Sequence, residues 1–391
     1  MSQPTSAETT GRFLVLLENN STAAGVRELN RVAGIQVATT ADTVAEQIAS
    51  TDGVIFHELG IALVDATPDQ LPGLNRAIDE PGPVLAVEAE RVVHAITTTD
   101  ADETASAAAV DESVFTWGLQ AVGAGLSTAT GKGIRVAVLD TGFTVAHPDF
   151  AGRTVTTSSF VTGEAVDDEH GHGTHCVGTS CGPRTPASGP GYGVAHEAEI
   201  YAGKVLGNSG SGSDGGILAG IEWAIANGCA VISMSLGATV RPGTPHSAIF
   251  EQAASRALAK GTLIVAASGN DSRRPGTVSP VGHPANCPSI MAVGAVDVNR
   301  ATAFFSCGTV DTVGAVDVVG PGVDVHSSWK AGGTKRLQGT SMATPHVAGV
   351  AALMAEKHGA RGFELWARLA QTARRLPSPS TDVGAGLVQA P

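Results

Sequence analysis

The chain has 391 residues, of which 42% are hydrophobic, with 49 glycines and 20 prolines, enough for one large core and a small second domain. The net charge is −13, and no basic patch indicates a nucleic-acid partner. The sequence has no run of 18 or more apolar residues that would predict a membrane span, so no membrane partner is expected.

Negative charge is concentrated in residues 1–110, which hold 16 acidic side chains, 5 arginines and no lysine. The remainder of the chain is nearly balanced, and a compositional break of this size favours a boundary near residue 110. We therefore expect a small domain over residues 1–96. Residues 97–110, rich in Thr, Ala and acids, predict a linker, and residues 111–391 predict the main domain.

The N-terminal region alternates short apolar runs with amphipathic ones. Their order, strand-helix-strand-strand-helix-strand, predicts a small α+β domain of the split βαβ type. The expected elements are a strand at 12–17, a helix at 21–32, strand-like runs around Gly60 within 53–66, a helix at 68–80 and a strand at 83–96.

The first ten residues lack the basic start, the long apolar stretch and the cleavage site of a secretory signal. Three explanations are compatible with this pattern: the protein works in the cytoplasm, it leaves the cell by another route, or a preceding region is missing from the sequence. The compartment is therefore left unknown.

The main domain alternates buried-type strands with helices, a pattern that predicts an α/β fold with a mostly parallel sheet and helices on both faces. A further helix is expected to follow Ser341 through the core, and a last one to begin near Phe363. The expected strands are 134–139, 199–205, 230–235, 262–267 and 289–293, and the helices between them are 216–227 and 247–260.

Three polar residues stand at places where such a fold gathers its chemistry. Asp140 ends an apolar strand, at the edge where open α/β sheets place their sites. His172 lies among glycines at the start of a helical segment. Ser341 follows a Gly-Thr turn at a helix N-terminus, where free N–H groups favour negative charge. Each has an ordinary alternative, respectively a strand-to-loop turn, a polar turn and a helix N-cap.

The order Asp…His…Ser is that of subtilisin. Together with three motifs in that order, it makes the chain resemble a subtilisin-like serine protease (subtilase) from about residue 111 to its end. The motifs are Val138-Leu139-Asp140-Thr141-Gly142, His172-Gly173-Thr174-His175 and Gly339-Thr340-Ser341-Met342-Ala343-Thr344-Pro345.

The resemblance implies a serine endopeptidase that cuts peptide or protein substrates through an acyl-enzyme. Ser341 would be the nucleophile, His172 the general base and Asp140 the residue that orients the imidazole. Asn270, after Ser268-Gly269 at the end of another strand, would point its amide at the oxyanion. The alternative for Gly269-Asn270 is a simple turn.

Substrate contacts also follow from the resemblance. A glycine-rich edge segment would pair with an extended substrate. A strand end would form one wall of the pocket for the residue just before the cut, here called the first pocket. Gly282 at the base of that pocket leaves it roomy, so a large apolar or aromatic residue is expected before the cut, while Asp271 at the rim would tolerate a basic one. The expected contact residues are Gly210, Ser211, Gly212, Ser235, Leu236, Gly237, Gly269 and Gly282. A flexible loop is the alternative for residues 208–216.

Residues 1–96, especially 83–94, resemble the subtilase prodomain, which acts as a folding template and as an inhibitor whose tail lies in the active cleft. The resemblance implies that the chain's own prodomain inhibits it and that it cuts itself between His94 and Asp111. Two alternatives remain, namely an unrelated accessory domain and a silent or permanently inhibited binding module.

No cofactor is expected for catalysis, because His170, His172 and His175 lack the helical spacing of a metalloprotease. Asp149 matches a subtilase carboxylate that binds calcium, but the segment 181–193 lacks the usual Asn-bearing loop. Structural calcium is therefore left open. The metal site is unknown, with Asp149 as its one candidate.

Five cysteines leave at least one unpaired, and this low, odd count slightly favours free thiols. Cys176 stands four residues after His172, so it is expected beneath the histidine on the same short helix, as a small buried apolar side chain. The five are Cys176, Cys181, Cys229, Cys287 and Cys307.

Overall fold

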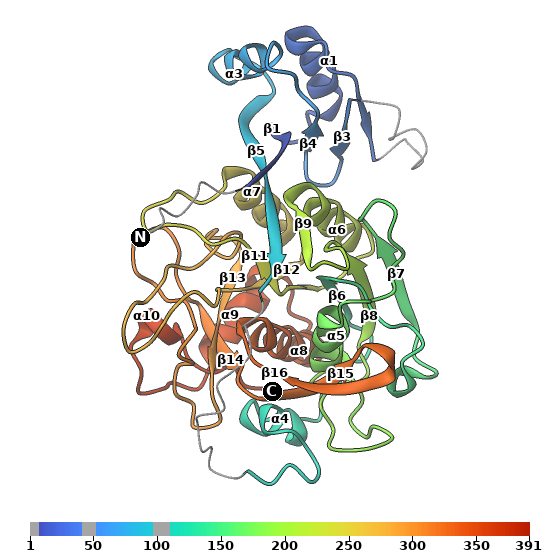
Figure 1. Cartoon of the computed structure of the whole chain (residues 1–391), viewed down its shortest axis with the longest axis vertical. Helices are drawn as coiled ribbons and strands as arrows, with labels where there is room; N and C mark the ends of the chain where they lie inside the picture. Colours follow the sequence, from blue (N-terminus) through green and yellow to red (C-terminus); the bar gives the residue numbers. More distant parts are fainter. Residues whose placement is uncertain (1–7, 41–51, 97–109) are drawn as a thin grey trace.

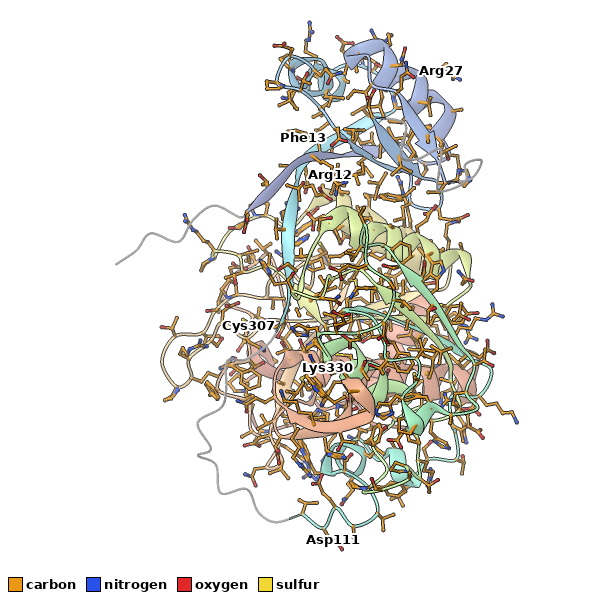
Figure 2. All side chains as sticks on the ribbon, turned by 45° about the vertical axis from the view of Figure 1, so that its right-hand side comes forward. Arg12, Phe13, Arg27, Asp111, Cys307 and Lys330 are labelled. Carbon is orange, nitrogen blue, oxygen red and sulfur yellow. The ribbon has the colours of Figure 1, made fainter. Side chains whose placement is uncertain are left out.

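The structure, a computed structural model, describes residues 8–40, 52–96 and 110–391. A large α/β body carries a smaller N-terminal unit on one side, and one long strand of that unit runs into the body (Figure 1). Asp111 lies at the end of the body opposite the small unit (Figure 2). The predicted linker at 97–110 falls outside the described residues except for Val110, as do residues 1–7.

The body is built on a seven-stranded sheet in which all neighbouring strands are parallel. Its central strands are fully buried and, apart from Ser233, apolar, as expected for a parallel sheet covered on both faces. The predicted α/β fold is confirmed. In spatial order the strands are β14 (Val318–Pro321), β13 (Met291–Val296), β12 (Leu263–Ala267), β10 (Val231–Met234), β6 (Arg135–Asp140), β8 (Glu199–Lys204) and β7 (Val155–Ser159).

The helices lie on two sides of this sheet. The pair α5 and α8 pack together below it, whereas α6 and α7 lie between the sheet and the small unit (Figure 1). Helix α8 is buried from Thr340 to Ala355 because it passes through the core. The helices of the body are α4 (Trp117–Ala121), α5 (His172–Cys181), α6 (Asp214–Ala226), α7 (Ala248–Ala259), α8 (Thr340–His358), α9 (Gly362–Thr372) and α10 (Ser380–Val383).

Shorter elements complete the body. They include an antiparallel hairpin of β15 and β16 and two short strands that receive the strand from the small unit. Within the described residues, no helix is both long enough and apolar enough to cross a membrane. These elements are β9 (Ser211–Ser213), β11 (Leu236–Gly237), β15 (Val325–Trp329), β16 (Gly333–Leu337) and the 3-10 turns η1 (Ala124–Leu126), η2 (Pro148–Phe150) and η3 (Lys330–Gly332).

The N-terminal unit has its own core, in which Val15, Leu17, Leu29 and Leu74 are buried between two helices and a sheet. Its sheet order, β5-β1-β4-β3-β2, contains the predicted split βαβ arrangement plus one short edge strand, β2, that was not predicted. Its elements are β1 (Thr9–Leu17), α1 (Thr22–Ala33), β2 (Val37–Thr39), β3 (Gly53–Phe56), β4 (Ile61–Val64), α3 (Leu71–Asp79) and β5 (Val84–Ala95).

Strand β5 belongs to both parts of the molecule. Its first half pairs with β1, and its last residues lie between β9 and β11 of the body, antiparallel to both. Val93 is fully buried there. The end of the small unit therefore occupies the body's cleft as an added strand, which is how extended peptides bind to sheet edges.

Candidate active site

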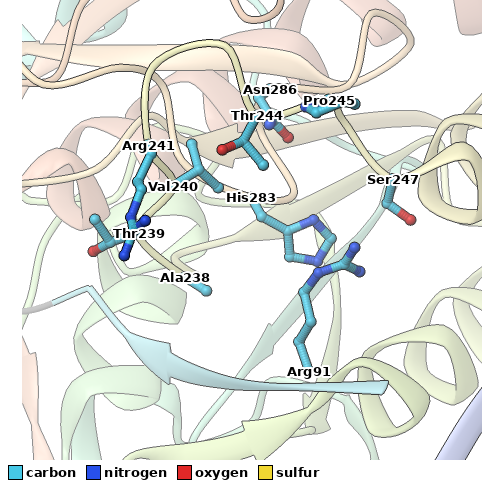
Figure 3. Close-up of a pocket in the computed structure, with 10 residues that line it drawn as sticks. All are labelled: Arg91, Ala238, Thr239, Val240, Arg241, Thr244, Pro245, Ser247, His283 and Asn286. Carbon is cyan, nitrogen blue, oxygen red and sulfur yellow. The ribbon is translucent and has the colours of Figure 1, made fainter. Parts of the chain in front are cut away.

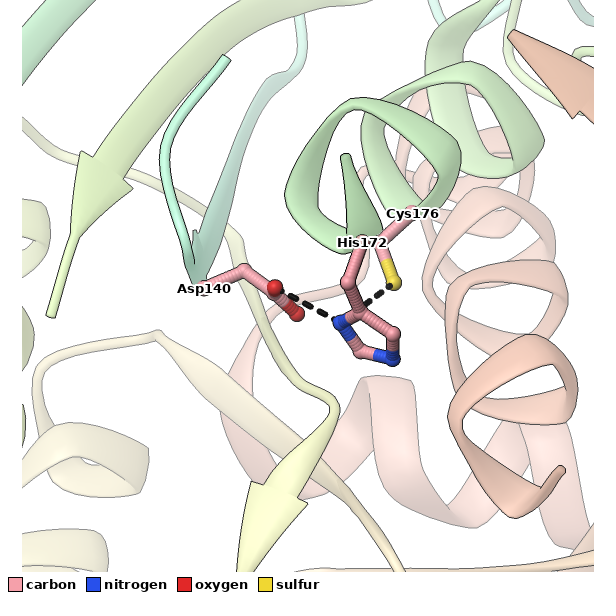
Figure 4. A group of neighbouring side chains, drawn as sticks. All are labelled: Asp140, His172 and Cys176. Atoms are coloured by element: carbon pink, nitrogen blue, oxygen red, sulfur yellow. Dashed lines mark hydrogen bonds and ion pairs between the residues drawn. The ribbon is translucent and has the colours of Figure 1, made fainter. Parts of the chain in front are cut away.

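Asp140 and His172 meet although 32 residues separate them in the chain. Asp140 is the last residue of β6, His172 is the first residue of α5, and both side chains are only 1% exposed. His172 Nδ1 lies 2.7 Å from Asp140 Oδ1 (Figure 4). An ionised carboxylate can only accept a hydrogen bond, so Nδ1 carries the proton, and in the neutral ring Nε2 is left as an acceptor.

The start of α5 is held by close backbone packing and by a second buried carboxylate. Gly171 has φ +101°, and a Cβ there would lie 2.6 Å from the Trp329 ring, so only glycine fits. Asp168 accepts hydrogen bonds from the N–H groups of Gly171 and Thr174 and from the Thr141 hydroxyl. Asp168 thus ties the end of β6 to the start of α5, which fixes the relative position of Asp140 and His172.

Ser341 is the second residue of α8, and it follows Gly339, whose φ is +151°. Its Oγ lies 2.5 Å from the Ile96 carbonyl oxygen and 3.2 Å from the Ser235 carbonyl oxygen. Among the described residues no hydrogen bond joins Ser341 to His172, and His172 Nε2 is buried without a partner. The hydroxyl is therefore directed at the end of the inserted strand.

Cys176 lies beneath His172, as predicted. Its Sγ is 3.9 Å from His172 Nδ1 and 3.6 Å from the Ser341 carbonyl oxygen, so the sulfur touches both residues. Burial raises the pKa of Cys176 to about 11, which keeps the thiol protonated near neutral pH. The side chain is suited to packing rather than to nucleophilic attack.

Asn270 reaches the same carbonyl oxygen as Ser341. Its Nδ2 lies 3.3 Å from the Ile96 oxygen, and its Oδ1 accepts hydrogen bonds from the N–H and hydroxyl of Thr340, both at 2.9 Å. These two bonds require the amide to face Ile96 with its NH₂ group. Gly269, with φ +113°, supplies the turn between β12 and Asn270.

The predicted cleft residues surround the end of β5. The Ala95 N–H donates to the Gly210 oxygen at 2.8 Å, and the Ile96 N–H donates to the Ser235 oxygen at 3.2 Å. The remaining partners are Ser211 and Gly237, opposite His94, Gly212, opposite Val93, and Leu236, opposite Ala95. The backbone of the inserted strand is thus bound from both sides.

The first pocket is placed less completely. A Cβ at Gly237 would lie 3.3 Å from Ile96 Cδ1, so Gly237 borders the Ile96 side chain. Gly282 lies against Ala238, whose oxygen would be 3.0 Å from an added Cβ. Asp271 is exposed and accepts a hydrogen bond from Thr239. The roles of Gly282 and Asp271 in specificity stay predictions.

The charge state of His172 is governed by its neighbours. Burial by itself would lower its pKa, but the Asp140 carboxylate, helped by Cys176, outweighs burial and raises the pKa well above its usual value. His175, by contrast, has its pKa lowered to about 3 by burial and by His172. Its Nε2 lies 3.1 Å from the oxygens of both Val325 and Lys335, so His175 is a neutral donor.

The three histidines have different neighbours: the ring centroids of His170 and His172 are 6.1 Å apart, whereas His175 bonds the backbone oxygens of Val325 and Lys335. In the described part of the chain, the one group of three His, Cys, Asp or Glu ligand atoms within 4.8 Å is Asp140, His172 and Cys176. Its members already bond one another, and its thiol is protonated. All five cysteines are free and buried, as the odd count favoured.

Asp149, the calcium candidate, is engaged by protein donors. The Tyr192 hydroxyl donates to its Oδ2 at 2.6 Å, and the Ala187 N–H reaches its Oδ1 at 3.4 Å. Calcium needs six to eight oxygen ligands. In the described part of the chain no group of three His, Cys, Asp or Glu ligand atoms includes Asp149, so the side chains around it do not fit a calcium site.

Some residues of the cleft escaped the sequence analysis. Ile96 was not singled out as the residue at the candidate nucleophile. Asp214, at the start of α6, and His283 form a buried pair with an Oδ1–Nε2 distance of 2.9 Å. The acidic residue just after Ser213, at the start of an apolar helical pattern, was a helix N-terminus signal that could have drawn attention to Asp214.

Comparisons with known proteins agree with this geometry. Residues 131–386 match the model of the subtilase family. Subtilisin Savinase of Lederbergia lenta is 44% identical over 280 residues, which cover 70% of this chain and 96% of that protein. Subtilisin DY of Bacillus licheniformis is 41% identical over 256 residues, covering 65% of this chain and 86% of its own length.

A third relative extends the likeness toward the N-terminus. The M-protease of Shouchella clausii is 40% identical over 355 residues, covering 86% of its length and 88% of this chain, more than residues 111–391 could supply. The chain belongs to the subtilase family and is a subtilisin-like serine-type endopeptidase.

Proposed function

We propose that Asp140, His172 and Ser341 act as a catalytic triad and that residues 1–96 form a prodomain. In this proposal the prodomain inhibits the enzyme until the chain cuts itself after Ile96. One observation carries the proposal, namely that the Ile96 carbonyl oxygen receives both the Ser341 hydroxyl, at 2.5 Å, and the Asn270 amide, at 3.3 Å. The carbonyl group of a peptide bond that is to be cut would lie between these two side chains.

The chemistry follows from the atoms at hand. Ser341 Oγ turns its hydrogen from the Ile96 oxygen to His172 Nε2, which is buried and has no other partner. His172 takes the proton as Oγ attacks the carbonyl carbon, and later returns it to the leaving amine. Asp140 keeps the proton on Nδ1 and offsets the charge of the imidazolium. Water then hydrolyses the acyl-enzyme.

The oxyanion of the tetrahedral intermediate would be stabilised by two donors. Asn270 Nδ2 already faces the carbonyl oxygen, and Ser341, as the second residue of α8, has a backbone N–H without an intrahelical partner. In a subtilisin, loss of one such side-chain donor costs about 10²–10³ in turnover.

The contacts of the small unit support a prodomain rather than an unrelated accessory domain. Two carboxylates of β5 meet the N-termini of the two helices beneath it. Glu88 accepts from the Ser247 hydroxyl and the Ile249 N–H, and Glu90 accepts from the Gly215 N–H. Helix N-termini favour negative charge, so these contacts stabilise the docked state.

Processing of the full chain tests the proposal. Intact mass and N-terminal sequencing are expected to show a cut between Ile96 and the next residue. A fluorophosphonate is expected to label Ser341, as mapped by peptide mass spectrometry, once the N-terminal fragment has been cleared by limited proteolysis. No label at Ser341 before or after proteolysis would instead favour a silent binding module.

Calcium is not proposed as a stabilising ligand at Asp149. Because one oxygen of Asp149 binds the Tyr192 hydroxyl and Asp149 belongs to no group of three candidate ligands among the described residues, removing divalent cations should leave the local structure unchanged. We expect a chelator to change the melting temperature of the parent and of Asp149→Asn by the same amount. A fall on chelation that occurs in the parent alone would show that Asp149 holds calcium after all.

A further inference from the structure

Beyond the triad, one buried carboxylate of the cleft contacts the inserted strand. Asp214 is the first residue of α6 and its side chain is 0% exposed. Its Oδ2 accepts from the backbone N–H of Arg91 at 3.2 Å and from the Arg91 guanidinium at 3.1 Å. Any residue except proline could supply the first contact, but the second requires a side-chain donor, and a basic side chain supplies one that also carries a charge.

The strand register explains why these two residues meet. In the antiparallel pairing of β5 with β9, Val92 lies opposite Ser213, so the next residue, Arg91, comes opposite Asp214. Counted back from Ile96, Arg91 is the sixth residue before the bond at Ser341. An extended substrate bound in the same register would place its own sixth residue opposite Asp214.

The surroundings form a site that can hold a long side chain. A pocket of about 260 Å³ opens beside Arg91, and its walls include Val240, Thr244, Ser247 and His283. Figure 3 shows the Arg91 guanidinium alongside the His283 ring, with Ser247 on the same side. The pocket and the carboxylate together provide room for the side chain and a partner for its charge.

Asp214 is held as an anion. Burial by itself would raise its pKa, but His283, through charge and a 2.9 Å hydrogen bond, and Arg91 lower it below the usual value. Glu88, the other partner of Arg91 at 3.0 Å, lies on β5 itself and leaves with the prodomain. Asp214 is therefore the carboxylate of the body that bonds Arg91, and it remains for a substrate.

We propose that Asp214 makes the cleft selective for substrates with Arg or Lys at the sixth residue before the cleaved bond. The inference rests on the proposed function, because it takes the strand ending at Ile96 as a guide to substrate register. A buried, charge-assisted hydrogen bond is worth enough to raise kcat/KM by about tenfold over a neutral side chain.

The test compares two peptides that differ only at this sixth residue, Arg in one and Gln in the other, each with Ile before the cut. The enzyme is the full chain after processing. We expect the Arg peptide to have a kcat/KM about tenfold higher. In Asp214→Asn, which keeps a side chain able to bond His283, the ratio should fall close to one.

A matched control is Glu364→Gln, which removes one negative charge from a half-exposed side chain on α9 and should leave the tenfold ratio intact. If the parent cuts both peptides equally fast, the inference is wrong while the proposed function stands. If it cuts neither, the proposed function fails as well. A ratio that survives in Asp214→Asn would assign the selectivity to another group.

Discussion

Replacing Ser341 with alanine is expected to lower kcat by about 10⁶-fold and to leave the precursor uncut, since triad residues act as a unit. The hydroxyl is directed at the Ile96 carbonyl, and no cysteine takes its place, because the nearby Cys176 is protonated and faces the Ser341 backbone oxygen. Hydrolysis of a chromogenic peptide and the intact mass of the full chain measure the two effects.

Ser233→Ala is the matched control. Ser233 lies in β10 next to the cleft, is fully buried, and has a hydroxyl with no hydrogen-bond partner among the described residues. Removing the Ser233 oxygen should change kcat by less than about threefold and should leave processing intact. Substantial residual turnover or processing in pure Ser341→Ala protein would contradict the assigned nucleophile.

The body of the fold could be predicted because its strands are apolar on both faces. Strand β12, for example, has every residue buried, and its sequence is a continuous apolar run. The two edge strands were not predicted. β7 is rich in Thr and Ser and only partly buried, and β14 is short and ends in Gly-Pro, so neither has that pattern.

The same reasoning explains which parts of the site could be predicted. Asp140 ends β6 and Asn270 comes shortly after β12. The C-terminal ends of these parallel strands meet at one edge of the sheet, so local patterns and chain order suffice to bring the two residues together. Ile96 could not be found this way, since its position at Ser341 depends on the register between β5 and β11. Docking of two separate units sets that register.

Long-range polar pairs were missed for a related reason. Asp214 and His283 are 69 residues apart, and Asp149 and Tyr192 are 43 apart, with no periodic pattern linking either pair. The Tyr192 contact also explains why the calcium candidate does not fit. The resemblance implies a carboxylate at Asp149, but only the structure shows that a hydroxyl is bonded to its Oδ2.

The second large effect is expected for Asp140→Asn, with kcat about 10⁴-fold lower at neutral pH. An asparagine amide can donate to Nδ1, which would move the ring proton to Nε2 and remove the base from the side facing Ser341. Asp140 Oδ1 accepts from both His172 Nδ1 and the Thr141 N–H, each at 2.7 Å, so an amide turned to donate to Nδ1 also gives up the Thr141 bond, while the size of the side chain is preserved.

The pH profile separates this role from a merely structural one. The base must be neutral, and Asp140 raises the pKa of His172, so kcat/KM of the parent should rise with pH through a midpoint above about 6.5. Without the carboxylate the pKa of His172 falls. The rise of kcat/KM with pH, which is the acid limb of the profile, should therefore move to lower pH in Asp140→Asn.

Asp168→Asn is the control, because Asp168 is equally buried but bonds Gly171 and Thr174 instead of the ring. Because Asp168 fixes the start of α5, its loss should lower stability and kcat, but it should shift the acid limb less than Asp140→Asn does. An unshifted limb in Asp140→Asn would refute the assignment.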